Sequence, residues 1–155
     1  VFDHHGVVYE YANGTRMYAF CRTQNGCYGE NSSLLVGTKG RASTTRCRIE
    51  GETNWQYREK AENPYDIEHK VLLDAIRSGN PVNAGDYMAR STMVGVMGQI
   101  TCYSGREVTW DQVMKSDYVY LPKPEDVTLD MEPPVKLGPD GEYPVFAHPG
   151  VTKIL

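Results

Sequence analysis

The chain has 155 residues, of which 16 are Lys or Arg and 20 are Asp or Glu, so its formal net charge is −4. Acidic and basic residues are mixed along the chain, so we expect no nucleic-acid partner, because phosphate binding needs a concentrated basic surface. No apolar run approaches the roughly 20 residues of a membrane-spanning helix, so no membrane partner is expected. The length suits a single domain. Because the chain opens at Val1 inside a predicted strand, we expect it to be part of a longer polypeptide.

The first predicted elements are two strands, at residues 7–11 and 15–22, that form a β-hairpin. Both are rich in β-branched and aromatic residues. The Asn13-Gly14 pair between them supplies the positive φ angles that a tight hairpin turn requires. Apolar or aromatic side chains fall on both faces of the second strand, so we expect a sheet that is covered on both sides.

More strands follow a Gly- and Asn-rich loop at residues 23–32. We predict a third strand at 33–36, a turn at 37–40, a fourth strand through 42–49 and a possible short strand at 55–58. The Gly-Thr-Lys-Gly turn is not interpreted as a phosphate site, because it lacks the glycine spacing and the following helix. The first 60 residues therefore predict four or five antiparallel strands.

A first helix is predicted to follow these strands. It begins at Asn63-Pro64, a capping residue followed by the proline favoured at the first helical position, and it ends at Gly79. Its apolar residues recur at helical spacing and should pack on a sheet; they are Ile67, Val71, Leu72, Ala75 and Ile76.

Two further helices are predicted. The first covers residues 84–103 and has apolar or small groups around much of its circumference, so we expect it to be buried, with Gly95 and Gly98 allowing backbones to approach closely. The T-x-x-Q pattern from Thr109 to Gln112 predicts a capping box that opens a short helix ending near residue 116. The predicted fold class is α+β, with an open, predominantly antiparallel sheet and helices packed on one face.

Residues 122–155 are predicted to form an extended, proline-rich arm. Its apolar residues are spaced through the segment, so we interpret it as lying across the domain or across a neighbouring subunit rather than as disorder. The predicted organisation is an α/β domain at residues 1–121 with this arm as part of the same domain. Prolines that exclude regular structure over most of the arm stand at positions 122, 124, 133, 134, 139, 144 and 149.

No motif for catalysis, nucleotide binding or metal binding is recognisable. The chain has no G-x-G-x-x-G, no G-x-x-x-x-G-K-[ST] and no G-x-S-x-G, so no dinucleotide site and no nucleophile elbow is predicted. His4 and His5 are adjacent and point to opposite faces of a strand, so they cannot share a metal in the usual way, although one of them could face a pocket. We predict no catalytic residue, no metal site and no cofactor-binding residue in this chain.

The four cysteines have no C-x-x-C spacing and are too few for a disulfide scaffold, so we interpret them as ordinary thiols. Cys21 and Cys27 flank a loop, and a disulfide or a reactive pair between them is the alternative in an oxidising compartment. The other two are Cys47 and Cys102.

The best local candidates for ligand binding are Arg22, Gln24 and Tyr28, at the end of a strand and in the loop beyond it. Loops on a rigid sheet commonly carry binding groups. Guanidinium, amide and phenol groups suit a polyhydroxylated ligand. The alternative is that these residues only cap the loop and provide a polar surface.

Five segments in order carry a resemblance to a known family. They are V-V-Y-E-Y-A-N-G-T-R-M, C-R-T-Q-N-G-C, V-G-T-K-G, N-P-Y-D-I-E-H-K-V-L-L-D-A-I-R-S-G-N-P-V-N and M-G-Q-I-T-C-Y-S-G-R-E-V-T-W-D-Q-V. From about Phe2 to Leu155 the chain resembles the C-terminal domain of the glucose-fructose oxidoreductase and inositol dehydrogenase family (Gfo/Idh/MocA).

That resemblance implies a dihydrodipicolinate-reductase-like C-terminal fold in a two-domain subunit. The partner is an N-terminal Rossmann domain that binds NAD or NADP and carries a catalytic lysine in a Glu-Lys-Pro motif. The C-terminal domain supplies one wall of a sugar site and an open sheet for homo-oligomerisation. Here Glu59-Lys60 is followed by Ala61 and lies in the wrong domain, so Lys60 should not inherit the catalytic role. Candidates for the substrate wall, chosen by position, are His5, Arg22, Gln24 and Tyr28.

The resemblance therefore predicts a domain that is inactive alone, in an NAD(P)-dependent oxidoreductase acting on a sugar or sugar-like alcohol. The alternative, from another functional class, is a freestanding, non-catalytic domain for binding or assembly. A third reading is a parent enzyme that cleaves glycosides with the help of transient oxidation, because oxidising a sugar acidifies a neighbouring C–H.

Overall fold

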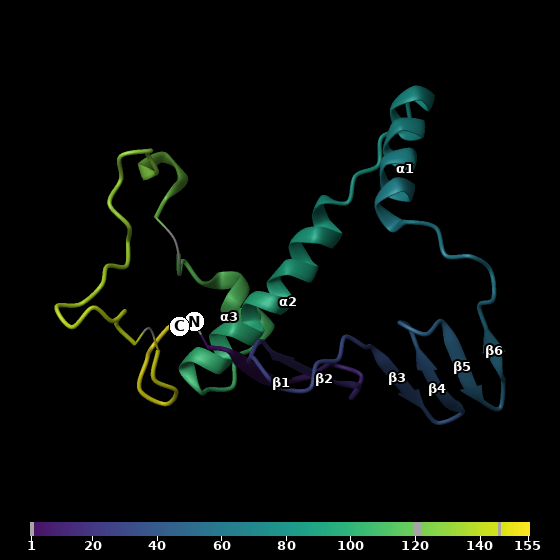
Figure 1. Ribbon diagram of the computed structural model, residues 1–155, viewed down its shortest axis with the longest axis horizontal. Helices are drawn as coiled ribbons and strands as arrows, with labels where there is room; N and C mark the ends of the chain where they lie inside the picture. Colours follow the sequence, from purple (N-terminus) through teal and green to yellow (C-terminus); the bar gives the residue numbers. More distant parts are fainter. Residues whose placement is uncertain (1, 120–121, 146) are drawn as a thin grey trace. The chain divides into compact units, whose positions relative to one another are not determined.

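The structure is a computed structural model that describes residues 2–119, 122–145 and 147–155. In these residues two open antiparallel sheets and three α-helices are present (Figure 1). The predicted α+β class is therefore confirmed, with the strands divided between two sheets. Two compact units are described separately below: the hairpin unit, Val1–Asn25 with Gly85–Leu155, and the sheet unit, Gly26–Ala84.

The hairpin unit begins with β1 (His4–Glu10) and β2 (Arg16–Arg22), which pair antiparallel from His4 opposite Arg22 to Glu10 opposite Arg16. The turn forms at the predicted residues, but with a positive φ at Gly14 and not at Asn13. Gly14 has a φ of 81°, and the Asn13 side-chain oxygen accepts a hydrogen bond from the Thr15 amide at 3.0 Å. Strand alternation then places His5, Val7 and Tyr9 on one face of β1.

Helix α2 (Gly85–Ser104) lies beside this hairpin (Figure 1), close to the predicted bounds. The expectation that it is buried was wrong for its N-terminal half, where Tyr87 and Met88 are exposed. The hydrogen bonds between the hairpin and α2 involve Val94 and Cys102, and residues 85–92 of the helix are all exposed. The core gathers at the C-terminal half and consists of Val7, Ile100, Tyr103, Val113 and Ala147.

Helix α3 (Trp110–Lys115) opens with the predicted capping box. The Thr109 hydroxyl accepts from the Gln112 amide at 3.2 Å, and the Gln112 side chain accepts from the Thr109 amide at 2.8 Å. The remaining described residues contain one 3-10 turn, Pro124–Asp126. Near the end of the arm the Gly150 amide donates to the Ser104 carbonyl at 2.7 Å, so the arm returns to the C-terminus of α2.

The sheet unit contains β3 (Leu34–Gly37), β4 (Gly40–Ser43), β5 (Arg48–Gly51) and β6 (Trp55–Gln56), in that order across one sheet. Arg41 and Arg48 both pair with Glu50 on one face, at 3.1 and 2.7 Å. The register places one side chain from each strand in a row across the other face. We call this the apolar row: Leu35, Ala42, Ile49 and Trp55.

Helix α1 (Pro64–Ser78) also lies in the sheet unit and begins and ends as predicted. The Asn63 side chain caps it by accepting from the Tyr65 amide at 3.0 Å, and Gly79 adopts the left-handed conformation that ends it, with φ of 71°. The expectation that its apolar stripe packs on a sheet was wrong within this unit. Ala75 is buried, but Ile67, Val71, Leu72 and Ile76 are exposed, because caps and local spacing form a helix without supplying a surface to cover it.

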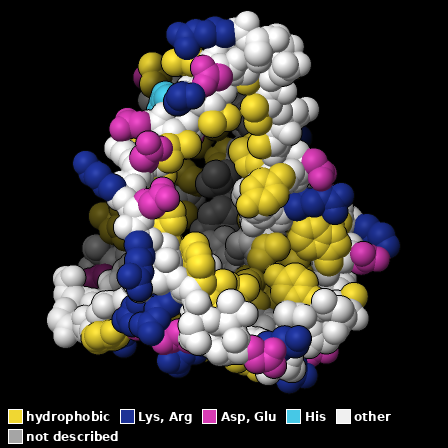
Figure 2. Space-filling model, turned by 90° about the vertical axis from the view of Figure 1, so that its right-hand side faces the viewer, with side chains coloured by type: hydrophobic (Ala, Val, Ile, Leu, Met, Phe, Trp, Pro, Cys, Tyr) yellow, Lys and Arg dark blue, Asp and Glu magenta, His cyan; other side chains and the backbone are white. Residues whose placement is uncertain are grey.

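Apolar side chains remain at the surface of both units (Figure 2). The accessible area of the chain is 13688 Å². Two separate globular proteins with the same total mass as this chain would together expose about 9,000–10,000 Å². In the sheet unit Ala75 is the only buried residue. Both units therefore leave apolar faces that a further surface could cover.

Candidate functional site

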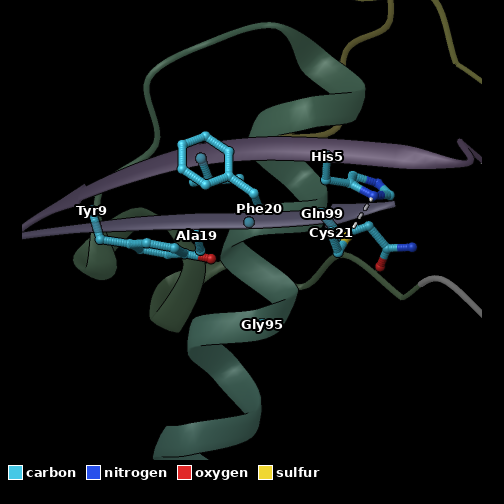
Figure 3. A pocket seen from close by; sticks show the side chains of 9 residues that line it. His5, Tyr9, Ala19, Phe20, Cys21, Gly95 and Gln99 are labelled. Atoms are coloured by element: carbon cyan, nitrogen blue, oxygen red, sulfur yellow. Dashed lines mark hydrogen bonds between the residues drawn. The ribbon is translucent and has the colours of Figure 1, made fainter. Parts of the chain in front are cut away.

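The candidate site is a pocket of about 330 Å³ between the hairpin and α2, within the hairpin unit. Figure 3 shows side chains from both strands on the side of the hairpin that faces α2, whereas the Phe20 ring lies on the other side of the strands. Its walls are mainly apolar, and the polar groups are an imidazole, a phenol, a thiol and an amide. The residues that line it are His5, Val7, Tyr9, Ala19, Phe20, Cys21, Gly95, Gly98 and Gln99.

A close contact between Tyr9 and α2 forms one end of the pocket. The Tyr9 hydroxyl donates to the Val94 carbonyl at 2.9 Å. A Cβ on Gly98 would clash with the Tyr9 hydroxyl oxygen, so glycine is what lets the phenol lie against the helix. Gly95, by contrast, has open space around it. The partial burial of the Tyr9 phenol raises its pKa, because desolvation disfavours the charged form.

His5 and Cys21 face each other at the other end of the pocket. They are directly opposite in the hairpin register, and the Cys21 Sγ lies 3.5 Å from the His5 Nδ1 (Figure 3). The imidazole lies beside two aromatic rings, with centroids 6.0 Å from both Phe2 and Tyr103. Its other nitrogen, Nε2, is buried and has no hydrogen-bond partner among the described residues. The ring is thus positioned by packing, with Nδ1 turned toward the thiol.

A second thiol lies nearby on α2. The Cys102 Sγ is 4.0 Å from the Gly6 carbonyl oxygen, across the helix–hairpin contact. Burial raises the pKa of the Cys102 thiol, so this residue stays neutral at pH 7. Its side chain acts there as a small packing group rather than as a nucleophile.

Gln24 and Arg22 lie at the open end of the hairpin. The Gln24 amide donates to Asp3 Oδ2 at 2.8 Å, and His4 Nδ1 is 2.6 Å from Asp3 Oδ1. Both hydrogen bonds lower the pKa of the Asp3 carboxyl, and the bond from Gln24 has the larger effect. Arg22 pairs with His4 in the register, on the face opposite Cys21. Gln24 therefore fastens the loop to residue 3.

Tyr28 belongs to the sheet unit, where it is 79% exposed and its hydroxyl donates to the Glu30 carboxylate at 3.2 Å. The structure therefore places one of the four sequence candidates, His5, in the pocket. Arg22 and Gln24 each lie at the open end of the hairpin and do not line the pocket, and Tyr28 is in a different unit. Sequence reasoning missed Tyr9, Cys21 and Gln99. The available signal was that positions 5, 7 and 9 lie on one face of a strand, and that Gly95 and Gly98 lie on one face of a helix.

The N-termini of the three α-helices do not suit the pyrophosphate of a dinucleotide. The pyrophosphate of NAD(P) binds at a helix N-terminus that follows a Gly-rich turn. The helices α1, α2 and α3 each carry an aspartate in the first turn, which repels phosphate; these residues are Asp66, Asp86 and Asp111. In the described part of the chain, no group of three or more His, Cys, Asp or Glu side chains could hold a metal ion.

Comparisons with protein-family models, curated proteins and solved structures gave no match to this chain. Among the described residues, no helix has the length and apolar character needed to cross a bilayer.

Proposed function

We propose that this chain is the substrate-wall and oligomerisation domain of an NAD(P)-dependent oxidoreductase acting on a sugar or sugar-like alcohol. In this proposal the nicotinamide cofactor and the groups that transfer hydride and proton belong to a Rossmann domain of the same polypeptide. The chain is then inactive alone. Its resemblance to the C-terminal domain of the glucose-fructose oxidoreductase and inositol dehydrogenase family supports this assignment, as do two features of the structure.

The pocket is the observation that carries the substrate part of the proposal. A sugar presents hydroxyl groups at its edge and C–H groups on its faces. The Gln99 amide can both donate to and accept from hydroxyls, and the Tyr9 oxygen can accept while its hydrogen is given to Val94. Val7 and Ala19 form an apolar wall that suits the C–H face. Mostly apolar walls with a few placed polar groups are typical of small-molecule sites.

The apolar row supports the oligomerisation part of the proposal. Leu35, Ile49 and Trp55 are exposed on one face of the sheet unit, and the opposite face carries the Arg41–Glu50–Arg48 ion pairs. A sheet with one apolar face is stable when that face is covered. A second copy of the chain can cover it symmetrically, because a two-fold interface uses the same patch twice.

The exposed faces, taken alone, also favour the second candidate function, a freestanding assembly domain without redox chemistry. The two candidates differ in what precedes the domain in the gene. The oxidoreductase requires an upstream G-x-G-x-x-G turn between a strand and a helix and a Glu-Lys-Pro motif, and an upstream region without them would eliminate it.

Titration of the isolated chain with NAD and NADP by calorimetry tests where the cofactor binds. We expect heats no larger than those of a control protein. Micromolar binding of either dinucleotide to this chain would contradict the division of labour between the two domains.

A further inference from the structure

We propose that Cys21 and His5 form a reactive-thiol site that takes small-molecule disulfides, so that Cys21 is the position at which this protein is reversibly thiolated. The proposal does not depend on the proposed function, because it concerns the chemistry of two side chains within the hairpin unit. Thiolation at this position would place the added group at the pocket.

The geometry supplies a proton acceptor for the thiol. An ordinary thiol with a pKa near 8.5 is only about 3% thiolate at pH 7, and the thiolate is the reactive form. The His5 Nδ1 lies 3.5 Å from the Cys21 Sγ, and the cross-strand register holds the two residues opposite each other. Because the Phe2 and Tyr103 rings flank the imidazole, Nδ1 stays directed at sulfur. An imidazole next to a cysteine activates thiols in this way.

Access and charge around Cys21 also favour reaction. Cys21 is exposed, so a small disulfide can reach its sulfur. The groups that face it are His5 from β1 and, from α2, Gln99 and Cys102. Gln99 is uncharged, and burial raises the pKa of Cys102, so neither places a negative charge beside a Cys21 thiolate at neutral pH.

The reaction is a thiol–disulfide exchange. The Cys21 thiol gives its proton to His5 Nδ1, and the sulfur attacks one sulfur of the disulfide R–S–S–R. The new S–S bond forms as the old one breaks, and the departing R–S⁻ takes the proton from His5 to leave as R–SH. Cys21 is oxidised, the small disulfide is reduced, and the imidazole returns to its neutral form.

Cys47 provides an internal comparison. It is also exposed, but its thiol donates to the Thr44 carbonyl oxygen at 3.3 Å, and a carbonyl oxygen cannot take the proton. We expect Cys21 to react with bis(2-hydroxyethyl) disulfide at pH 7 about tenfold faster than Cys47. The rates are measured for each site by mass spectrometry of peptides from the treated chain.

Two variants test the role of His5. His5→Asn should bring the Cys21 rate at pH 7 down to that of Cys47, and the two proteins should converge at pH 10, where thiols ionise without a base. The matched control is His4→Asn, because His4 points to the opposite face and lies 2.6 Å from Asp3; it should leave the Cys21 rate unchanged. A purely structural effect of His5→Asn would persist at pH 10.

The proposal is overturned if Cys21 reacts no faster than Cys47 in the unmodified chain, or if His5→Asn reacts as fast as its parent at pH 7. If His5→Asn does not fold, as judged by circular dichroism, the ratio of the Cys21 and Cys47 rates in the unmodified chain decides the question. A disulfide between Cys21 and Cys102, detected in place of the mixed disulfide and lost in Cys102→Ser, would also count against the site as stated.

Discussion

At the scale of single residues, Gly98 determines how closely the hairpin and α2 approach. A glycine inside a helix is usually unfavourable by about 0.5–1 kcal/mol relative to alanine. Here the Tyr9 hydroxyl occupies the space of the missing side chain and bonds to the Val94 carbonyl. The sequence predicted close approach at both Gly95 and Gly98, but only the second has a neighbour there, because helix rotation relative to the strand is a tertiary property.

This difference gives a paired prediction. Gly95→Ala should be neutral or stabilising, since alanine favours the helix and meets nothing within 4 Å. Gly98→Ala should be less stable than Gly95→Ala by about 1–3 kcal/mol, because Tyr9 must move and give up its hydrogen bond. Urea unfolding of the two variants measures the difference. Equal stabilities would mean that the Tyr9 contact does not form.

The raised pKa of Tyr9 predicts a dependence of stability on alkaline pH. A group whose folded-state pKa is raised releases its proton more readily when unfolded, so folding is progressively penalised as the pH rises past the ordinary tyrosine value of about 10. Tyr9→Phe should be about 1 kcal/mol less stable than the parent chain at pH 7, because it loses the hydrogen bond. Between pH 8 and 11 it should lose less stability than the parent chain does. Melting temperatures across this range test it.

The matched control for that experiment is Tyr87→Phe, since Tyr87 is exposed on the uncovered half of α2. This variant should follow the parent chain over the whole pH range. If Tyr9→Phe and Tyr87→Phe lose stability in parallel with the parent, the phenol of Tyr9 is not desolvated in the folded state.

At the scale of elements, the turns and helix ends that depend on interactions within a few residues were predicted correctly. The Asn13-Gly14 turn, the Asn63 cap, the Gly79 end of α1 and the Thr109 capping box all form, because each needs only neighbouring backbone groups. What covers each element could not be predicted in this way. The sequence predicted that the apolar stripe of α1 and the first half of α2 are buried. Local spacing, however, does not determine which surface covers them.

The apolar row of the sheet unit is the feature at this scale whose role is most directly testable. We expect the chain to be a dimer or larger assembly at tens of micromolar by light scattering, because Leu35, Ile49 and Trp55 can be covered by a second copy. Ile49→Lys should shift the chain toward monomer by placing a charge within the row. Val36→Lys, on the opposite face of the same sheet and 78% exposed, should leave the assembly intact.

A monomer at those concentrations would contradict this role for the sheet. So would dissociation by Val36→Lys to the same extent as by Ile49→Lys, because the effect would then follow from added charge rather than from the row.

At the scale of the whole molecule, we propose that this chain provides a substrate wall and an assembly surface, and that another domain carries out the redox chemistry. The candidate site follows the same division between local and tertiary information. Strand alternation indicated only that His4 and His5 point to opposite faces, and His5 was chosen as a candidate by its position. That Tyr9, Cys21 and Gln99 line the same pocket could not be predicted, because their association requires α2 to lie on one particular face of the hairpin.

The measurement that tests this assignment most directly is steady-state oxidation of a panel of sugars and cyclic polyols by the complete gene product, with NAD or NADP. We predict turnover, and Gln99→Ala should raise the KM for the preferred sugar about tenfold, the cost of one lost hydrogen bond, while the KM for the dinucleotide stays unchanged. Gln56→Ala, in β6, serves as the control and should match the parent. A complete gene product that neither binds a dinucleotide nor oxidises any of these alcohols would contradict the account.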